Sequence, residues 1–174
     1  IDTAQLNNDQ GLIQHTGLND FILNVADRID NNAGKIISNA NTTEIKTNTL
    51  SSVAGEILHA GEQQLQITAQ NLQGQQGKIQ SNNLLKMDLG TANLDNATTA
   101  AQNINLITTE LSHQHGQLIQ SDANGQLNIN VAQTLNNTSG VISAAGIASI
   151  QTADLNNQQG VIQTLASKDL KITS

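Results

Sequence analysis

The sequence contains no cysteine, proline, tryptophan or tyrosine, and Phe21 is its only aromatic residue. The absence of cysteine excludes a disulfide framework. Globular cores usually rely on aromatic side chains for much of their buried area, so a core of that kind is excluded as well. The apolar residues are aliphatic instead, and they stand among many Asn, Gln, Ser and Thr residues. A core made of aliphatic side chains alone requires that they recur at regular positions.

Charge is scarce and mostly negative, with seven Lys and Arg against 14 Asp and Glu and a net charge of −7. Nucleic-acid binding calls for basic patches and usually for stacking aromatic residues, so this composition argues against it. No apolar run approaches the ~20 residues of a transmembrane helix, and no segment has the layout of a signal peptide. The chain starts at Ile1 rather than Met, from which we expect a fragment of a longer protein.

What the sequence does contain is a repeat of Leu, four residues, Gly, one residue and Ile. In one copy Leu50 leads to Gly55 and Ile57. The lead positions, roughly 22 residues apart, are Leu6, Ile29, Leu50, Leu72, Leu94, Leu111, Leu135 and Leu155. A fixed period of ~20 to 50 residues is typical of solenoids and other repeat arrays.

Within one repeat, the apolar spacing is that of β-strands. Leu65 and Ile67 alternate with polar residues, as in a half-buried strand, and residues 56–58 form a second short apolar segment. Similar pairs are Met87 and Leu89, Ile104 and Leu106, Ala148 and Ile150, and Leu170 and Ile172. Asn and Gly separate the segments, and we expect them to form sharp corners, because both tolerate the positive φ that such corners need.

These features predict an all-β fold, a parallel β-helix of about eight coils with roughly 22 residues each. Helical repeats are longer and use strong helix formers, and leucine-rich repeats have a different leucine pattern. Stacking would place leucine over leucine and isoleucine over isoleucine, and Asn residues at equivalent corners would form amide ladders. We expect residues 1–174 to form a single segment of a longer array, because both ends fall in mid-coil.

One coil, at about residues 91–110, departs from the pattern. If Leu94 is its lead residue, Thr99 stands where Gly is expected and Ala101 where Ile is expected. The next lead residue, Leu111, also arrives early. A bulge, a shortened coil or an altered twist is predicted there, although ordinary drift of a repeat would have the same appearance.

Three repeats, at residues 6–13, 135–142 and 155–162, read Leu-Asn-Asn-x-x-Gly-x-Ile. They resemble the haemagglutinin repeats of filamentous haemagglutinin-type exoproteins, and the resemblance extends along the chain except for the coil at Leu94. It implies a right-handed parallel β-helix in a very large secreted bacterial surface protein, exported by two-partner secretion through a dedicated outer-membrane transporter. Members include adhesins and contact-dependent growth-inhibition effectors, whose repeats form a stalk. The chain contains neither the family's secretion domain nor a recognisable toxin module.

From this resemblance we expect a structural and interaction segment of a cell-surface exoprotein, and no enzyme. The expected partners are the secretion transporter, for the full-length protein, and a receptor on a target cell; no nucleic acid or small-molecule substrate is expected. One alternative is that the chain is itself the receptor-binding region of a growth-inhibition effector. A second alternative is a β-helical carbohydrate-active enzyme or a phage fibre.

The four histidines were considered as metal ligands. His15 and His59 occupy similar places two coils apart, about 10 Å from one another, which is too far to share one zinc ion. His113 and His115 flank a corner residue without a third ligand nearby. We therefore expect histidines exposed at corners and no metal site.

Carboxylates are equally sparse. Asp88, Asp95 and Glu110 form no evident pair of the kind that glycoside hydrolysis needs, at ~5 to 9 Å. Asp9, Asp30 and Asp95 are isolated among neutral corner residues, which alone bind calcium weakly. The sequence predicts no catalytic, cofactor-binding or metal-binding residue.

Overall fold

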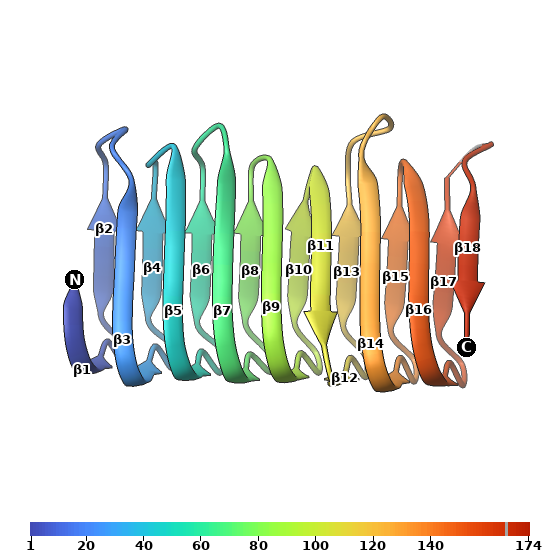
Figure 1. The fold of residues 1–174 in the computed structure, drawn as a ribbon, viewed down its shortest axis with the longest axis horizontal. Coiled ribbons are helices and arrows are strands. Elements are labelled where there is room, and N and C mark those ends of the chain that lie inside the picture. The colour runs from blue at the N-terminus through green and yellow to red at the C-terminus, as the bar shows by residue number, and fades with distance from the viewer. Residues whose placement is uncertain (166) are drawn as a thin grey trace.

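The computed structural model describes residues 1–165 and 167–174, whose strands alternate between two parallel sheets (Figure 1). The long sheet contains β1 (Asp2–Asn7), β3 (Phe21–Asp30), β5 (Thr42–Ser51), β7 (Gln64–Gln73), β9 (Leu84–Asn93), β11 (Asn103–Thr108), β12 (Glu110–Ser112), β14 (Gln126–Asn136), β16 (Ile147–Asn156) and β18 (Leu170–Thr173). The short sheet contains β2 (Leu12–His15), β4 (Lys35–Ser38), β6 (Glu56–His59), β8 (Lys78–Ser81), β10 (Thr98–Ala101), β13 (Gln117–Gln120), β15 (Val141–Ala144) and β17 (Val161–Thr164).

The two sheets are faces of one coil. In Figure 1 the chain runs up the short sheet at the back and down the long sheet at the front as it advances from the N-terminus on the left, so the coil is right-handed. Neighbouring coils pair in parallel, and equivalent residues such as Leu50 and Leu72 lie opposite each other in β5 and β7. The short sheet has eight strands in the described chain, one for each coil. The predicted parallel β-helix is confirmed.

The core is a set of aliphatic rows that run along the rod. In the third coil, Leu50, Ile57, Leu65, Ile67 and Ala69 are all buried, as the alternation predicts. Each side chain packs on its equivalents in the adjacent coils, at the inter-strand spacing of ~4.8 Å. Burial of a leucine or isoleucine contributes about 1.5–3 kcal/mol, so the rows are the main source of stability.

The last pair of predicted core residues keeps its register but is not covered. Leu170 lies opposite Ala148, and Ile172 lies opposite Ile150. Their exposed fractions are nevertheless 38% and 40%, because β18 forms the edge of the long sheet.

The repeat varies in length at only one of its two corners. Each long strand leads into a short strand through a four-residue turn, such as 52–55 or 113–116, which lies at the bottom of Figure 1. The opposite corner ranges from Gln102 alone to the five residues 121–125. Extra residues at this second corner leave the core unaffected. The number of residues per coil can therefore vary without disturbing the stacking.

The coil at 91–110 is a shortened coil, which was one of the predicted possibilities. The prediction of its lead residue was wrong. Ala92 lies opposite both Leu72 and Leu111, so Ala92 and not Leu94 holds the lead position. Thr99 therefore pairs with Ile79 and occupies the isoleucine position rather than that of glycine. The prediction failed because a leucine two residues later was a more conspicuous core candidate than an alanine.

Replacing Leu72 with Asp is expected to destabilise the rod by about 3–5 kcal/mol, because it removes a buried leucine and buries an unpaired carboxylate. Gln73, its exposed neighbour in β7, provides the matched control Gln73→Asp. The free energy of unfolding, from urea denaturation followed by circular dichroism, measures both. Equal stability of the two variants would show that the lead row does not hold the core.

Candidate functional site

The first residues of the four-residue turns form a row along the rod, here called the turn row, which is buried except at the half-buried Asn157. Its members are Asn8, Asn31, Ser52, Gly74, Leu94, His113, Asn137 and Asn157. Asn8 Nδ2 donates to Asn31 Oδ1 at 2.7 Å, and Asn31 Nδ2 donates to Ser52 Oγ at 3.0 Å. Asn137 Nδ2 likewise donates to Asn157 Oδ1 at 2.7 Å. The predicted amide ladder is confirmed at these positions.

The repeat glycines do not have the role that the sequence suggested. Positive φ, between 51° and 58°, belongs instead to the third residue of each four-residue turn: Gln10, Ala33, Ala54, Gln76, Asn96, His115, Ser139 and Gln159. None of the glycines in the described chain has a positive φ. Glycine is needed because a Cβ at Gly34 would collide with the carbonyl oxygen of Asn8, and one at Gly55 with that of Asn31. The constraint is the close approach of successive coils.

An apolar interruption divides the turn row into two polar segments. Gly74 replaces the usual polar residue, and Leu94 in the next coil fills the space beside it. A Cβ on Gly74 would lie only 2.9 Å from Leu94 Cδ2, so the leucine side chain occupies the space that a side chain at position 74 would take. In the same turn Ala97 takes the place of the repeat glycine.

His113 begins the second polar segment and is completely buried. Asn137 Nδ2 donates to the carbonyl oxygen of Gly140 at 3.2 Å, so Asn137 Oδ1 must face His113 Nδ1, 2.7 Å away. His113 therefore carries its proton on Nδ1, and Nε2 has no hydrogen-bond partner among the described residues. Burial lowers the pKa of His113, against the smaller opposing effects of the Asn137 hydrogen bond, the Asp95 charge and the Gln117 backbone. The imidazole is thus neutral at pH 7.

His59 is buried at the other corner, with partners on both nitrogens. Its Nε2 lies 2.9 Å from the carbonyl oxygen of Ala40, which can only accept, so Nε2 carries a proton. Its Nδ1 lies 3.1 Å from Ser81 Oγ, which is itself 3.0 Å from the carbonyl oxygen of Leu84. Burial lowers the pKa of His59, and the hydrogen bond to Ala40 acts in the opposite direction.

The prediction of exposed corner histidines is wrong for His59 and His113, because the last residue of a short strand and the first residue of a turn both point inward. His115 is exposed, and His15 is half-buried and stacks on Phe21 with ring centroids 5.2 Å apart. Over the described chain, no three His, Cys, Asp or Glu residues lie together as a metal site would require.

Of the acidic residues named in the sequence analysis, Asp9 and Asp95 join neighbouring turns, and the others do not. Asp95 Oδ1 accepts hydrogen bonds from Ser112 Oγ and from the backbone N–H of Gln114, both at 2.7 Å. Asp9 Oδ1 accepts from the backbone N–H of Asn32 at 2.8 Å, and Asp30 pairs with Arg28. Asp88 and Glu110 are exposed on the outer side of the long sheet.

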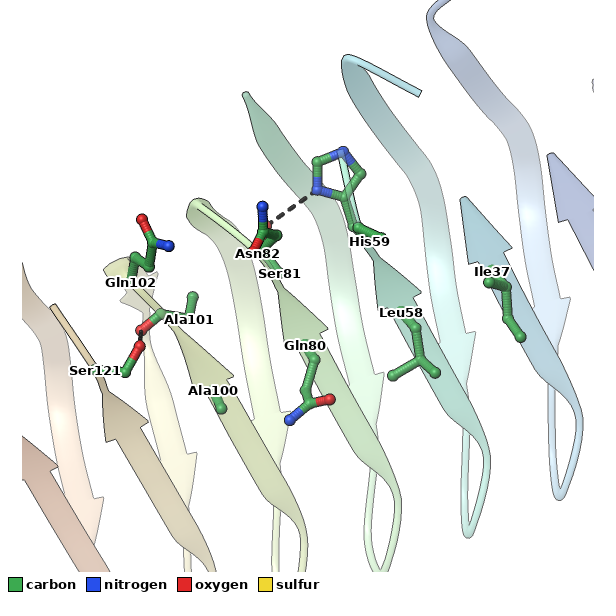
Figure 2. Close-up of a pocket in the computed structure, with 11 residues that line it drawn as sticks. Ile37, Leu58, His59, Gln80, Ser81, Asn82, Ala100, Ala101, Gln102 and Ser121 are labelled. Carbon is green, nitrogen blue, oxygen red and sulfur yellow. Dashed lines mark hydrogen bonds between the residues drawn. The ribbon is translucent and has the colours of Figure 1, made fainter. Parts of the chain in front are cut away.

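A hollow on the outer side of the short sheet, here called the outer groove, is the strongest candidate for an interaction site. Figure 2 shows Ile37, Leu58, Gln80 and Ala100 in one row across neighbouring strands. The hollow forms at β10 because Ala100 is much smaller than its counterparts in that row. Its floor is largely apolar, and its polar lining comes from the corner residues Asn82, Gln102 and Ser121.

Comparisons with protein-family models, with curated proteins and with solved structures give no match. Along the described residues, no helix has the length and apolar character needed to cross a membrane.

The account of the glycines predicts opposite effects at adjacent positions. Gly34→Ala should destabilise the protein by about 1–3 kcal/mol, since its Cβ collides with the preceding coil. Ala33→Gly should be neutral or stabilising by up to ~1 kcal/mol, because Ala33 has a φ of 51°. Urea denaturation of both variants measures the difference. A Gly34→Ala protein as stable as the parent would contradict the close-approach explanation.

Proposed function

We propose that this chain is a rod segment of a large secreted bacterial surface protein, and that it holds a binding or toxic element away from the cell. The observation that carries the proposal is the continuity of core and strand pairing through every described coil. Each coil adds one strand spacing, ~4.8 Å, to the length of the rod, so the number of repeats sets the reach. The resemblance of the repeats to haemagglutinin repeats supports the same role.

The use of polar groups supports a structural role rather than catalysis. The polar side chains form hydrogen bonds to neighbouring coils, as those of Asn31, Asn137 and Asp95 do. Acid–base catalysis on glycans needs two carboxylates facing a substrate at ~5 to 9 Å, and Asp95 is occupied by Ser112 and Gln114 instead.

The same proposal assigns export by two-partner secretion through an outer-membrane transporter, and display at the bacterial surface. In a solenoid each coil contacts only its neighbours, so folding can start in one coil and propagate to the next, which suits a chain that emerges progressively. The absence of cysteine means that no disulfide forms before passage. The partner at the far end of the parent protein is a receptor on a neighbouring cell.

A second candidate is that this chain contributes the receptor-binding surface itself. The outer groove favours it, because the small residues of β10 make a hollow with an apolar floor and a polar lining. Pockets of that composition are the usual binding sites of proteins.

A deletion in the parent protein separates the two candidates. Removal of residues 29–110 joins one lead position to another, since Leu111 then takes the place of Ile29. We expect surface display and target-cell binding to persist, and projections in electron micrographs to shorten by ~19 Å, four strand spacings. Absence of the parent protein from the surface of intact cells would overturn the rod proposal.

The matched control fills the outer groove without changing the length. Leu58→Gln combined with Ala100→Gln alters only half-buried outward positions on the short sheet. Target-cell binding should be unchanged if the segment is a spacer. Loss of binding in both the deletion and the groove variant would favour the receptor-binding alternative.

A further inference from the structure

The turns at 94–97 and 113–116, in adjacent coils, meet at a contact unlike the others, here called the joint. The backbone bridges it normally, with Leu94 N donating to Ser112 O and Asn96 N donating to Gln114 O, both at 2.8 Å. The side chains of the turn row make no hydrogen bond across the joint, because Leu94 has no polar group to offer His113. At the equivalent contact between Asn8 and Asn31, a side-chain hydrogen bond adds to the backbone pairing.

Two buried polar side-chain atoms without hydrogen-bond partners lie in the two coils that meet at the joint. His113 Nε2 is buried without a hydrogen-bond partner. The same holds for Thr99 Oγ1, in the strand that follows the turn 94–97. Thr99 occupies a core position that Ile79 and Leu118 hold in the neighbouring coils, and Ala92 occupies that of Leu72. Regions with fewer apolar contacts and unpaired polar groups open at lower free energy than the rest of a fold.

We propose that the joint is acid-sensitive and opens when His113 takes up a proton. The Nδ1 proton is already committed to Asn137 Oδ1, so the second proton must go to Nε2. That nitrogen has no hydrogen-bond partner in the closed joint. Protonation would make it a buried, charged donor, which is costly unless the turn separates and admits water. His59 differs, because Ala40 and Ser81 place an oxygen beside each of its nitrogens.

The groups around His113 do not offset this cost. From the turn before it, Asp95 is the acidic group whose charge acts on the imidazole, and its oxygens are engaged by Ser112 and Gln114. The following turn, 137–140, has no titratable side chain, and on its own turn His115 is exposed. Burial is the largest influence on His113 and opposes protonation; the Asn137 hydrogen bond, the Asp95 charge and the Gln117 backbone favour protonation but leave the pKa below its ordinary value.

The direction of the pH effect follows from linkage. Burial holds the pKa of His113 below its ordinary value of 6.5, so the opened joint binds the proton more readily than the closed one. The closed joint keeps its full stability above pH 6.5 and loses it as the pH falls below that value. A single proton changes the opening equilibrium by at most about tenfold per pH unit.

Hydrogen exchange on the intact chain at pH 7.5 and 5.5 tests the proposal. The protection factors of the Leu94 and Asn96 amides should fall by up to about tenfold. The reference is the Ala33 amide, which makes the equivalent bond to Val53 O in a polar part of the turn row. The protection factor of the Ala33 amide should change much less. An equal change at all three amides would overturn the proposal.

Two histidine variants assign the effect to one side chain. His113→Asn keeps an N–H for Asn137 and cannot titrate, so the acid response of Leu94 and Asn96 should disappear. His115→Asn makes the same change at an exposed position whose φ of 56° asparagine tolerates, and the response should persist. The opposite pattern would exclude His113 as the trigger. If His113→Asn fails to fold, an NMR titration of His113 in the parent decides, and a pKa at or above 6.5 would overturn the proposal.

Discussion

The distance between successive coils is the constraint on which the rest of the molecule depends. Parallel strand pairing sets it at ~4.8 Å, and every residue must tolerate its equivalent at that distance above and below. Aliphatic side chains and Asn amides satisfy the requirement by stacking on their own kind. At the repeat glycines, such as Gly34 and Gly55, the backbones come so close that no Cβ fits. The aliphatic rows, the turn row and the glycine positions are therefore consequences of one geometry.

The coil at 91–110 shows how this geometry accommodates exceptions. In its turn, an apolar contact replaces the side-chain hydrogen bond of other turns, since Leu94 fills the space left by Gly74. Its core is thinner, because Ala92 and Thr99 stand where other coils have larger aliphatic residues. The same preference for small residues in β10 makes the outer groove at Ala100. One coil thus combines small core residues with the outer groove.

The histidines show that position in the coil, rather than residue type, determines chemistry. His59 and His113 are both buried, and burial lowers the pKa of each. His59 has hydrogen-bond partners for both nitrogens, whereas His113 has one for Nδ1 alone. His115, two residues further on, is exposed and tolerates a positive φ. Protonation therefore has different structural consequences at His59 and at His113.

The sequence by itself determined the architecture: the parallel β-helix, the inward rows at Leu65 and Ile67, and the Asn ladder at positions such as Asn31. These follow from spacing along one chain, since alternation selects the inward side chains and the period brings equivalents together. Only the tertiary structure decided that Ala92 holds a lead position, that glycine prevents a collision between coils, and that His59 and His113 are buried. Each of those depends on what the neighbouring coil places at a given point, which the residue's own sequence neighbours do not specify.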